Sequence, residues 1–365
     1  MSSNLPHPAG AADAPTGAAE RPSIEASSDG AAAPACPPEP ASAPAPEPPP
    51  RAVWTLVEPT APWCPDVWTH HLEAVAPGLA AAHAGAARGE SIGEQLGVPG
   101  WTLVLASRRG RLHAHRGEHR EDAGAMVGLT GGWCAAVADG AGSAPWSRLG
   151  AAIATRVFTH AMRDTVPAGD GSREALATAM QQAAHAANAA MRDFAGRAGL
   201  ALRDLRTTLL AAVLHQGTVG VMQVGDGAMA LMRAERAVTH PHAAATGDYS
   251  GEVAHFLPDD GALTQLQQSL SLHTADDTVG LVLATDGVDD PWYPFTRHVG
   301  ALYSHLVHGV TEAAQLPAGL VPAWAGPVLD AADPVQALMD WLAFEKRGEN
   351  DDRTLCVVQR TGTTW

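Results

Sequence analysis

The chain has 365 residues and a formal net charge of −16, with 17% charged and 46% hydrophobic residues. This length allows one large domain or two smaller ones. The acidic balance excludes a general nucleic-acid-binding surface or a surface for anionic membranes, because both need a basic field.

No basic segment leads into an apolar core at the N-terminus, and no run reaches about 18 uninterrupted apolar residues. We therefore expect no secretory leader, no membrane span and a cytoplasmic location. Residues 1–50 are rich in Ala, Pro, Ser and Glu and hold almost no large apolar side chain. Such a segment cannot bury enough area to offset its ordering entropy, so we expect a disordered tail.

Residues 51–100 have a more mixed composition, which includes Trp54, Trp63 and Trp68. Large aromatic side chains need a surface on which to bury their rings. We therefore expect an N-terminal extension that packs on the main domain, with no role assigned to it. The main domain is expected over residues 101–360.

Within the main domain, short apolar runs between Gly-containing or polar turns predict strands. These runs are Trp101–Ser107, Trp133–Ala138, Thr207–Leu214, Thr218–Val224, Ala228–Met232, Thr278–Ala284 and Thr354–Gln359. Helical spacing predicts helices at Leu149–Met162, Ser172–Phe194, Phe295–Val310 and Pro334–Arg347. Strands occur in clusters between helical blocks rather than in strict alternation, which favours an α+β domain.

Acidic side chains stand where these predicted strands begin or end. They are Glu121, Asp122, Asp139, Asp226, Asp286, Asp351 and Asp352. A single Asp-Gly pair is an ordinary turn, but strands of one sheet would bring several such ends together. Clustered carboxylates repel one another unless a metal supplies positive charge. Oxygen-only ligands favour Mg²⁺ or Mn²⁺ over zinc. Two such ions could hold a phosphate and lower the pKa of a water molecule.

The order of the acidic motifs resembles the metal-dependent protein phosphatases of the PPM type, also called type 2C, over about residues 101–360. The matching pieces are Arg120-Glu121-Asp122, Val137-Ala138-Asp139-Gly140-Ala141-Gly142, Thr207-Thr208-Leu209, Val224-Gly225-Asp226-Gly227, Ala284-Thr285-Asp286-Gly287 and Asn350-Asp351-Asp352-Arg353-Thr354. Further segments resemble a bacterial branch, namely Gly247-Asp248-Tyr249 through His255-Phe256-Leu257, and His113 before Gly117. The resemblance implies a four-layer α-β-β-α sandwich with two metal ions, Mn²⁺ or Mg²⁺, at one end.

The resemblance also implies a role for each acidic position. Asp139 would bridge both ions and act in catalysis with Asp286, and the Gly140 carbonyl would bind one ion. Glu121 would serve the second ion, Asp286 and Asp351 the first, and Asp122 a metal-bound water. Asp226, with Asp286, matches a position that holds a third ion. The implied reaction is attack of metal-bound hydroxide on a phosphoserine or phosphothreonine of a protein, the substrate of a bacterial serine/threonine kinase.

Two positions depart from the family pattern. Family members with a phosphate-binding arginine carry it four residues before the glutamate, where this chain has Gly117. Arg116 is the nearest substitute and is our candidate, with Arg111 and Arg120 as alternatives. Animal members place a histidine directly after the Asp-Gly pair, where this chain has Ala141. Protonation of the leaving oxygen must then come from water or another group, and His113, His115 and His119 are candidates by their nearness in the chain.

Two other functions fit the same residues. One is a catalytically weak or silent member that binds a phosphoprotein and acts as a regulator. The other is a metal-dependent hydrolase of a small phosphate ester. Silent members usually lose metal ligands, whereas every ligand position here remains acidic or glycine, which favours activity.

Overall fold

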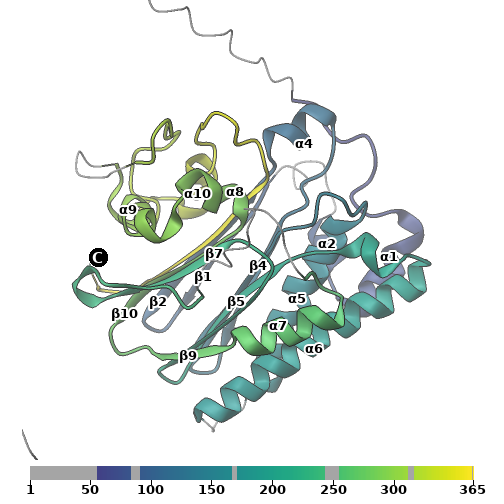
Figure 1. Cartoon of the computed structure of the whole chain (residues 1–365), viewed down its shortest axis with the longest axis horizontal. Helices are drawn as coiled ribbons and strands as arrows, with labels where there is room; N and C mark the ends of the chain where they lie inside the picture. Colours follow the sequence, from purple (N-terminus) through teal and green to yellow (C-terminus); the bar gives the residue numbers. More distant parts are fainter. Residues whose placement is uncertain (1–55, 84–90, 167–170, 243–254, 311–315, 364) are drawn as a thin grey trace, which may run out of the picture. The chain divides into compact units, whose positions relative to one another are not determined.

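Two antiparallel β-sheets pack face to face in the computed structural model, which describes residues 56–83, 91–166, 171–242, 255–310, 316–363 and 365. The expected tail at residues 1–50 and the motif Gly247–Tyr249 lie outside these described residues. One sheet has six strands in the order β1-β2-β11-β10-β7-β8, and the other has five in the order β3-β4-β5-β6-β9. Figure 1 shows the two sheets packed against each other, with helices on either side.

The strands of both sheets follow the apolar runs of the sequence. The six-stranded sheet contains β1 (Ser91–Val98), β2 (Trp101–Arg108), β7 (Ala228–Arg233), β8 (Val238–Thr239), β10 (Thr278–Ala284) and β11 (Arg353–Arg360). The five-stranded sheet contains β3 (Ala123–Leu129), β4 (Gly132–Ala138), β5 (Leu209–His215), β6 (Thr218–Val224) and β9 (Ser271–Thr274). A two-residue turn with positive φ at Gln216 (44°) and Gly217 (82°) joins β5 to β6.

The core between the sheets explains why the central strands are apolar without alternation. Leu103 and Leu105 of β2 belong to the cluster that also holds Trp133 and Val137 of β4. Their neighbour Val104 faces the other way, into the cluster beneath the helices. A strand buried on both faces needs apolar side chains on both.

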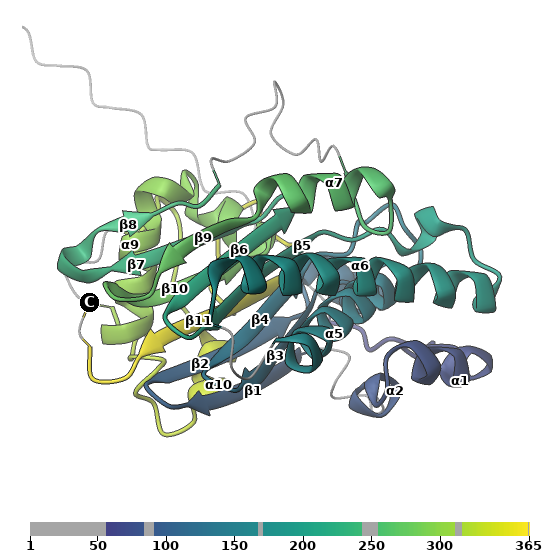
Figure 2. The ribbon, with the colours of Figure 1, turned by 90° about the horizontal axis from the view of Figure 1, so that it is seen from below.

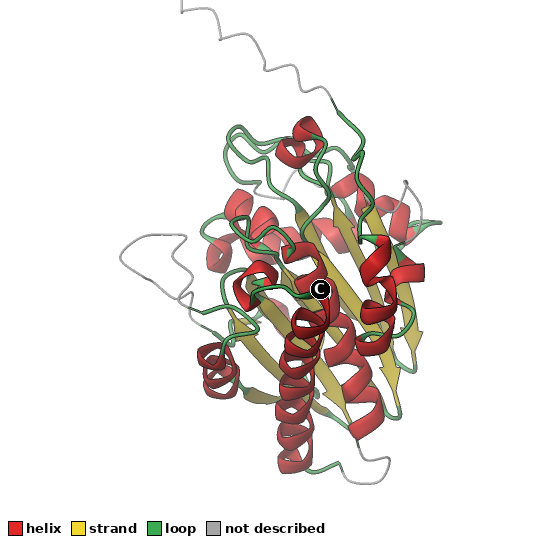
Figure 3. Cartoon of the chain, turned by 90° about the vertical axis from the view of Figure 1, so that its right-hand side faces the viewer, coloured by secondary structure: helices red, strands yellow, loops and turns green. Residues whose placement is uncertain are grey.

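Helices cover the outer face of each sheet, which completes four layers (Figures 2 and 3). The five-stranded sheet shares its apolar cluster with α1 (Asp66–Val75), α2 (Leu79–Ala82), α5 (Ser147–Thr165), α6 (Arg173–Ala198) and α7 (Asp260–Ser269). The six-stranded sheet is covered by α8 (Asp286–Asp289), α9 (Phe295–His308) and α10 (Pro334–Trp341). The short helix α4 (Arg111–Arg116) follows β2, and short 3-10 turns lie at Leu202–Leu205, Ala234–Arg236 and Asp290–Trp292. The predicted α-β-β-α sandwich is confirmed.

Some predicted boundaries differ from the structure. The helix expected over Pro334–Arg347 ends at Trp341. The Arg353 guanidinium donates hydrogen bonds of 2.7 Å to the backbone carbonyls of Leu342 and Phe344, so these carbonyls do not continue the helical pattern. β5 begins at Leu209 rather than Thr207, because Thr207 forms isolated bridges with Gly140 and Leu257. The strands β1, β3, β8 and β9 and the helices α4, α7 and α8 were not predicted from the sequence.

The N-terminal segment 56–83 lies against the sandwich. The Val57 N–H donates to the Ala114 carbonyl of α4 at 2.8 Å, and Trp63 is buried in the cluster of α5 and α6. β1 pairs with β2 from Ser91 to Val98, so the sheet extends N-terminal to residue 101. Among the described helices, none is long and apolar enough to cross a membrane.

Candidate metal centre

Three carboxylates meet at the ends of strands from both sheets. Asp139 follows β4, Asp226 follows β6 and Asp286 follows β10, and one carboxylate oxygen from each lies within 4.8 Å of the others. β4 and β6 belong to the five-stranded sheet and β10 to the six-stranded sheet. The group therefore depends on the face-to-face packing of the two sheets.

The backbone around Asp139 is held from two sides. Its N–H donates to Thr208 Oγ1 at 2.9 Å, and its carbonyl accepts from Thr207 Oγ1 at 2.7 Å and the Thr208 N–H at 2.9 Å. A Cβ at Gly140 would lie 2.8 Å from both the Glu121 carbonyl oxygen and Ser147 Cβ. Only glycine fits at this position, which fixes the direction of the chain immediately after Asp139.

Asp122 is buried behind this group. Thr285 Oγ1 donates to Asp122 Oδ2 at 2.7 Å, while Asp122 Oδ1 is buried without a hydrogen-bond partner. Arg120 is also buried, and its guanidinium donates to the carbonyls of Asp122 (2.9 Å) and Ser107 (3.2 Å). Arg120 therefore supports the loop instead of facing a substrate.

Glu121 is positioned by the buried carboxylate of Asp352. Asp352 Oδ2 accepts from the Glu121 N–H at 2.6 Å, and Oδ1 accepts from the Gly110 N–H at 2.6 Å. His113 joins the same group, with Nδ1 3.0 Å from Asp352 Oδ2 and Nε2 3.9 Å from Glu121 Oε2. Burial lowers the pKa of His113, but the Asp352 and Glu121 carboxylates more than offset this and raise it to about 9.

The electrostatics of the centre disfavour ionised carboxylates without a cation. Burial, then the charges of Asp122 and Asp286, raises the pKa of Asp139 well above its usual value. Burial, then Asp351 and Asp122, raises the pKa of Asp286 to about 8. Burial also raises the pKa of Glu121 to about 7, against the opposing effect of His113. Desolvation and like charge both favour the protonated forms.

A hard divalent cation fits this donor set. The three closest groups offer only carboxylate oxygens, and Asp122 Oδ1 is a buried acceptor without a donor. Among the residues that the structure describes, no ion pair joins Asp139, Asp226 or Asp286 to a basic side chain. Oxygen ligands without His or Cys match Mg²⁺ or Mn²⁺.

The structure brings the other predicted acidic residues to the same end of the sandwich. Asp351 is exposed, and its charge contributes to the raised pKa values of both Asp226 and Asp286. Sequence reasoning missed Asp289 in α8, whose Oδ1 is buried without a partner and whose pKa burial and Asp290 raise to about 7. Asp352 lies in the predicted motif Asn350–Thr354, but no role was predicted for it.

Only some of the predicted arginines and histidines lie near the acidic group in the structure. Arg116 is exposed and lies 3.8 Å from Glu118, in a cavity of about 490 Å³ that Glu121 also lines. Arg111 donates to Glu345 at 2.8 Å, away from that cavity. Of the three candidate histidines, only His113 contacts the acidic group; His119 Nε2 lies 2.8 Å from the Ala61 carbonyl, and His115 is exposed.

Sequence reasoning also missed Arg148 of α5, which lines the same cavity beside Glu121. Its Nε donates to the Trp63 carbonyl at 2.8 Å, and its guanidinium lies 4.5 Å from the centre of the Trp146 ring. Burial lowers the pKa of Arg148, and the nearby Glu121 opposes this effect. No local motif could have revealed Arg148, because only the folded segment 56–63 brings its partner Trp63 alongside α5.

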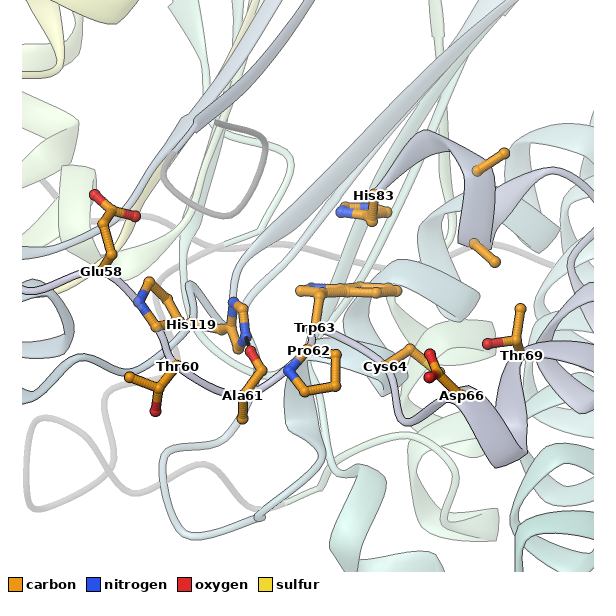
Figure 4. Close-up of a pocket in the computed structure, with 13 residues that line it drawn as sticks. Glu58, Thr60, Ala61, Pro62, Trp63, Cys64, Asp66, Thr69, His83 and His119 are labelled. Atoms are coloured by element: carbon orange, nitrogen blue, oxygen red, sulfur yellow. Dashed lines mark hydrogen bonds between the residues drawn. The ribbon is translucent and has the colours of Figure 1, made fainter. Parts of the chain in front are cut away.

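The segment 56–63 forms a wall of this cavity and of a larger one of about 710 Å³ (Figure 4). Trp63 and His83 stack with their ring centres 3.9 Å apart, and His119 faces Ala61. At Gly117, a Cβ would lie 3.1 Å from Val57 Cγ1. The position of the missing family arginine is therefore covered by the N-terminal segment.

A family model described as protein phosphatase 2C matches residues 109–320, which is more than half of the chain. The chain therefore belongs to the protein phosphatase 2C family, as its ordered Asp-Gly motifs predicted. No curated protein sequence matches the chain.

Solved structures of bacterial phosphatases resemble the chain at low sequence identity. Stp1 from Staphylococcus aureus has 14% identity and a TM-score of 0.43, covering 75% of this chain and 95% of its own. PstP/Ppp from Mycobacterium tuberculosis has 16% identity and a TM-score of 0.42, covering 71% and 98%. PppA from Pseudomonas aeruginosa, described as a regulatory component of the T6SS, has 17% identity and a TM-score of 0.43, covering 73% and 99%.

Proposed function

We propose that this protein is a phosphatase that uses divalent metal ions to hydrolyse phosphoserine and phosphothreonine monoesters on proteins. The observation that carries the proposal is the meeting of Asp139, Asp226 and Asp286 within 4.8 Å, without a basic partner among the described residues. Membership of the protein phosphatase 2C family supports the reaction class. Two Mn²⁺ or Mg²⁺ ions bound here would polarise a phosphate ester and lower the pKa of a water molecule.

Each acidic residue would hold a particular metal ion. Asp139 would contribute to both sites, together with the Gly140 carbonyl and Glu121 on one side. Asp286 and Asp351 would complete the other side, and Asp226 would supply a third, weaker site. Asp122, buried with one acceptor oxygen free, would orient a water molecule. The hydrogen bonds from Thr207 and Thr208 keep Asp139 in place as the charge around it changes.

The cavity beside Glu121 would receive the phosphate of the substrate. Arg116 and Arg148 both line it, and a planar guanidinium can donate two parallel hydrogen bonds to phosphate oxygens. Arg148 is held in one orientation by the Trp63 carbonyl and the Trp146 ring, whereas Arg116 is exposed. A preorganised donor loses less conformational entropy on binding. Arg148 is therefore the stronger candidate, and Arg116 would assist at the rim.

The test compares wild type with Asp139→Asn and Asp286→Asn in the hydrolysis of an aryl phosphate and of phosphoserine peptides, with and without Mn²⁺. We expect turnover that needs the metal and falls by at least about 100-fold in each variant, because even residues that only orient metal ligands typically cost 10–100-fold. Asp193→Asn serves as the control, since Asp193 is exposed on α6 and forms an ion pair with Arg197, apart from the acidic cluster. It should retain full rate.

Two outcomes would contradict the proposal. Turnover that survives complete chelation of metal would exclude the metal-dependent reaction. Full rate in Asp139→Asn would exclude the central role of that carboxylate. A wild-type protein that binds Mn²⁺ and phosphopeptide without turnover would favour a silent regulatory member, and preference for a small phosphate ester over every peptide would favour the third function.

A further inference from the structure

Four arginines line a cavity of about 330 Å³ between β2, α4 and the start of β11. They are Arg108, Arg109, Arg111 and Arg353, and Asp351 also lines the cavity. The whole chain carries only 23 basic residues against 39 acidic ones. A cavity with this much positive charge on an otherwise acidic protein attracts anions. We call this cavity the arginine pocket.

The register of the sheet places two of these cations directly opposite each other. Arg108 of β2 pairs with Arg353 of β11 in the antiparallel ladder. Like charges at directly opposed positions destabilise a sheet. Among the residues described in the structure, no ion pair joins Arg108 or Arg353 to a carboxylate. The charges of Glu349 and Asp351 oppose this repulsion at Arg353 without forming an ion pair with it among the described residues.

Arg353 forms the floor of the pocket. It is buried, its guanidinium donates to three backbone carbonyls and lies 3.9 Å from the centre of the Phe344 ring, and its Nε has no partner. Burial, then the charges of Arg111 and Arg108, lowers its pKa to about 10. Arg109 is likewise buried and donates to the Glu118 carbonyl. Arg353 and Arg109 form part of the pocket wall and contribute to its positive electrostatic potential.

Arg108 and Arg111 supply donors at the mouth of the pocket. Arg108 is half-buried, and its Nη1 donates a long hydrogen bond of 3.5 Å to the Met339 carbonyl. Arg111 donates to Glu345, a pair in which both side chains are partly exposed. Exposed pairs of this kind are weak, so an incoming carboxylate can compete with Glu345.

Asp351 connects the arginine pocket to the metal centre. It lines the pocket, and it is also one of the carboxylates proposed above to hold a metal ion. A peptide that places its phosphate at the metal centre therefore passes close to the mouth of the pocket. The rest of the acidic surface would repel an acidic peptide, so a basic pocket at this one position confers selectivity.

We infer that the arginine pocket binds an acidic side chain of the substrate peptide, close to the phosphorylated residue, through the guanidinium groups of Arg108 and Arg111. This inference rests on the proposed phosphatase function. It makes the protein selective for phosphorylation sites flanked by Asp or Glu. A planar guanidinium can donate two parallel hydrogen bonds to a carboxylate, and the positive charge of the buried Arg353 strengthens the attraction.

The first test measures binding without turnover. Labelled, unphosphorylated peptides that are rich in Glu, or carry Gln at the same positions, are titrated into the metal-free protein and followed by fluorescence anisotropy. We expect the Glu peptide to bind about fivefold more tightly than the Gln peptide. The double variant Arg108→Gln/Arg111→Gln should bind both peptides equally. The control is Arg163→Gln/Arg203→Gln, which removes the same charge from exposed residues that line none of the cavities described above.

The second test measures kcat/KM for phosphoserine peptides with the same Glu or Gln flanks. Wild type and the control variant should prefer the Glu peptide by about fivefold, and Arg108→Gln/Arg111→Gln should lose the preference while its hydrolysis of an aryl phosphate stays within about twofold of wild type. Equal binding of both peptides by wild type, or a preference that survives in the double variant, would overturn the inference. Selective binding without any turnover would leave the pocket standing and reject only the phosphatase function.

Discussion

The buried carboxylate of Asp352 accepts a hydrogen bond of 2.6 Å from the backbone N–H of Glu121, so one acidic residue positions another that faces the proposed metal site. The same carboxylate accepts from the Gly110 N–H, also at 2.6 Å. β11 and the loop before β3 are thereby joined at the edge of the acidic cluster. The position of Glu121 depends on a side chain more than two hundred residues away in the chain.

We predict that Asp352→Asn destabilises the protein and weakens metal binding. The amide has one acceptor oxygen in place of a charged pair, so one buried N–H loses its partner at a cost of about 1–3 kcal/mol. Urea unfolding should report that loss, and calorimetry on the folded variant should report an affinity for Mn²⁺ that is about tenfold lower. Asp193→Asn is the control; unchanged metal affinity in Asp352→Asn would mean that Asp352 only stabilises the fold.

A second prediction concerns Gly117, the position at which the resemblance implies a phosphate-binding arginine in some family members. Gly117 ends α4 with φ of 67°, and Gly199 ends α6 with φ of 70°. An alanine at either position carries a left-handed backbone penalty of about 1–2 kcal/mol. A Cβ at Gly117 would also meet Val57 at 3.1 Å, whereas a Cβ at Gly199 has no neighbour within 4 Å.

Gly117→Ala should therefore lower the free energy of unfolding more than Gly199→Ala does, as measured by urea denaturation. The difference between the two losses in unfolding free energy reports the clash of the new Cβ with Val57 in the N-terminal segment. Adding Val57→Ala to Gly117→Ala should remove that difference. Equal losses in the two glycine variants would show that Val57 moves aside freely. An arginine would then be tolerated at Gly117, and its absence would need another cause.

The amino-acid sequence predicted the central strands and the acidic residues at their ends, because both depend on short local patterns. Apolar runs of six to eight residues ending in Asp-Gly specify a buried strand followed by a turn, as at Asp139 and Asp286. β3 was missed because its sequence, Ala-Gly-Ala-Met-Val-Gly-Leu, contains two glycines. A Cβ at the first of them, Gly124, would lie 2.6 Å from Leu105, so that glycine reflects close packing between the sheets instead of a turn.

The supporting residues of the site could not be predicted, because their partners are distant in the chain. Arg148 lies on a helix with the spacing of an ordinary surface residue, and only the packing of Trp63 against α5 orients it. The arginines 108, 111 and 353 are separated in sequence and converge through the pairing of β2 with β11. Arg116, chosen for its nearness to Glu121 in the chain, does line the cavity but lies exposed at its rim.

A third prediction separates Arg148 from Arg116. Arg148→Gln should raise KM for an aryl phosphate about tenfold, since a charge-assisted hydrogen bond contributes about 1.5–3 kcal/mol; Arg116→Gln should raise it less. The control is Arg156→Gln, because Arg156 also lies on α5 and also donates to the N-terminal segment, at the Pro77 carbonyl. A rise in KM for Arg156→Gln equal to that for Arg148→Gln would mean that loosening of the segment, and not loss of a phosphate ligand, causes the effect.

The last prediction concerns acid stability and His305, which lies beneath α10. His305 is buried on α9, and its Nδ1 accepts a hydrogen bond of 3.0 Å from Trp341 Nε1. Burial lowers its pKa to about 4, below the usual value of 6.5 that it would regain in the unfolded chain. The folded state therefore binds fewer protons than the unfolded state between these pH values, and stability falls as the pH drops from about 6.5 towards 4.

His305→Gln keeps an acceptor for Trp341 but cannot take up a proton. We expect its Tm to fall less steeply than that of wild type between pH 7 and pH 5, by a margin of about 2 °C. His298→Gln, on the same helix and outside the contact with Trp341, should follow the wild-type curve. Parallel Tm curves for wild type and His305→Gln would show that His305 does not control the acid sensitivity of this layer.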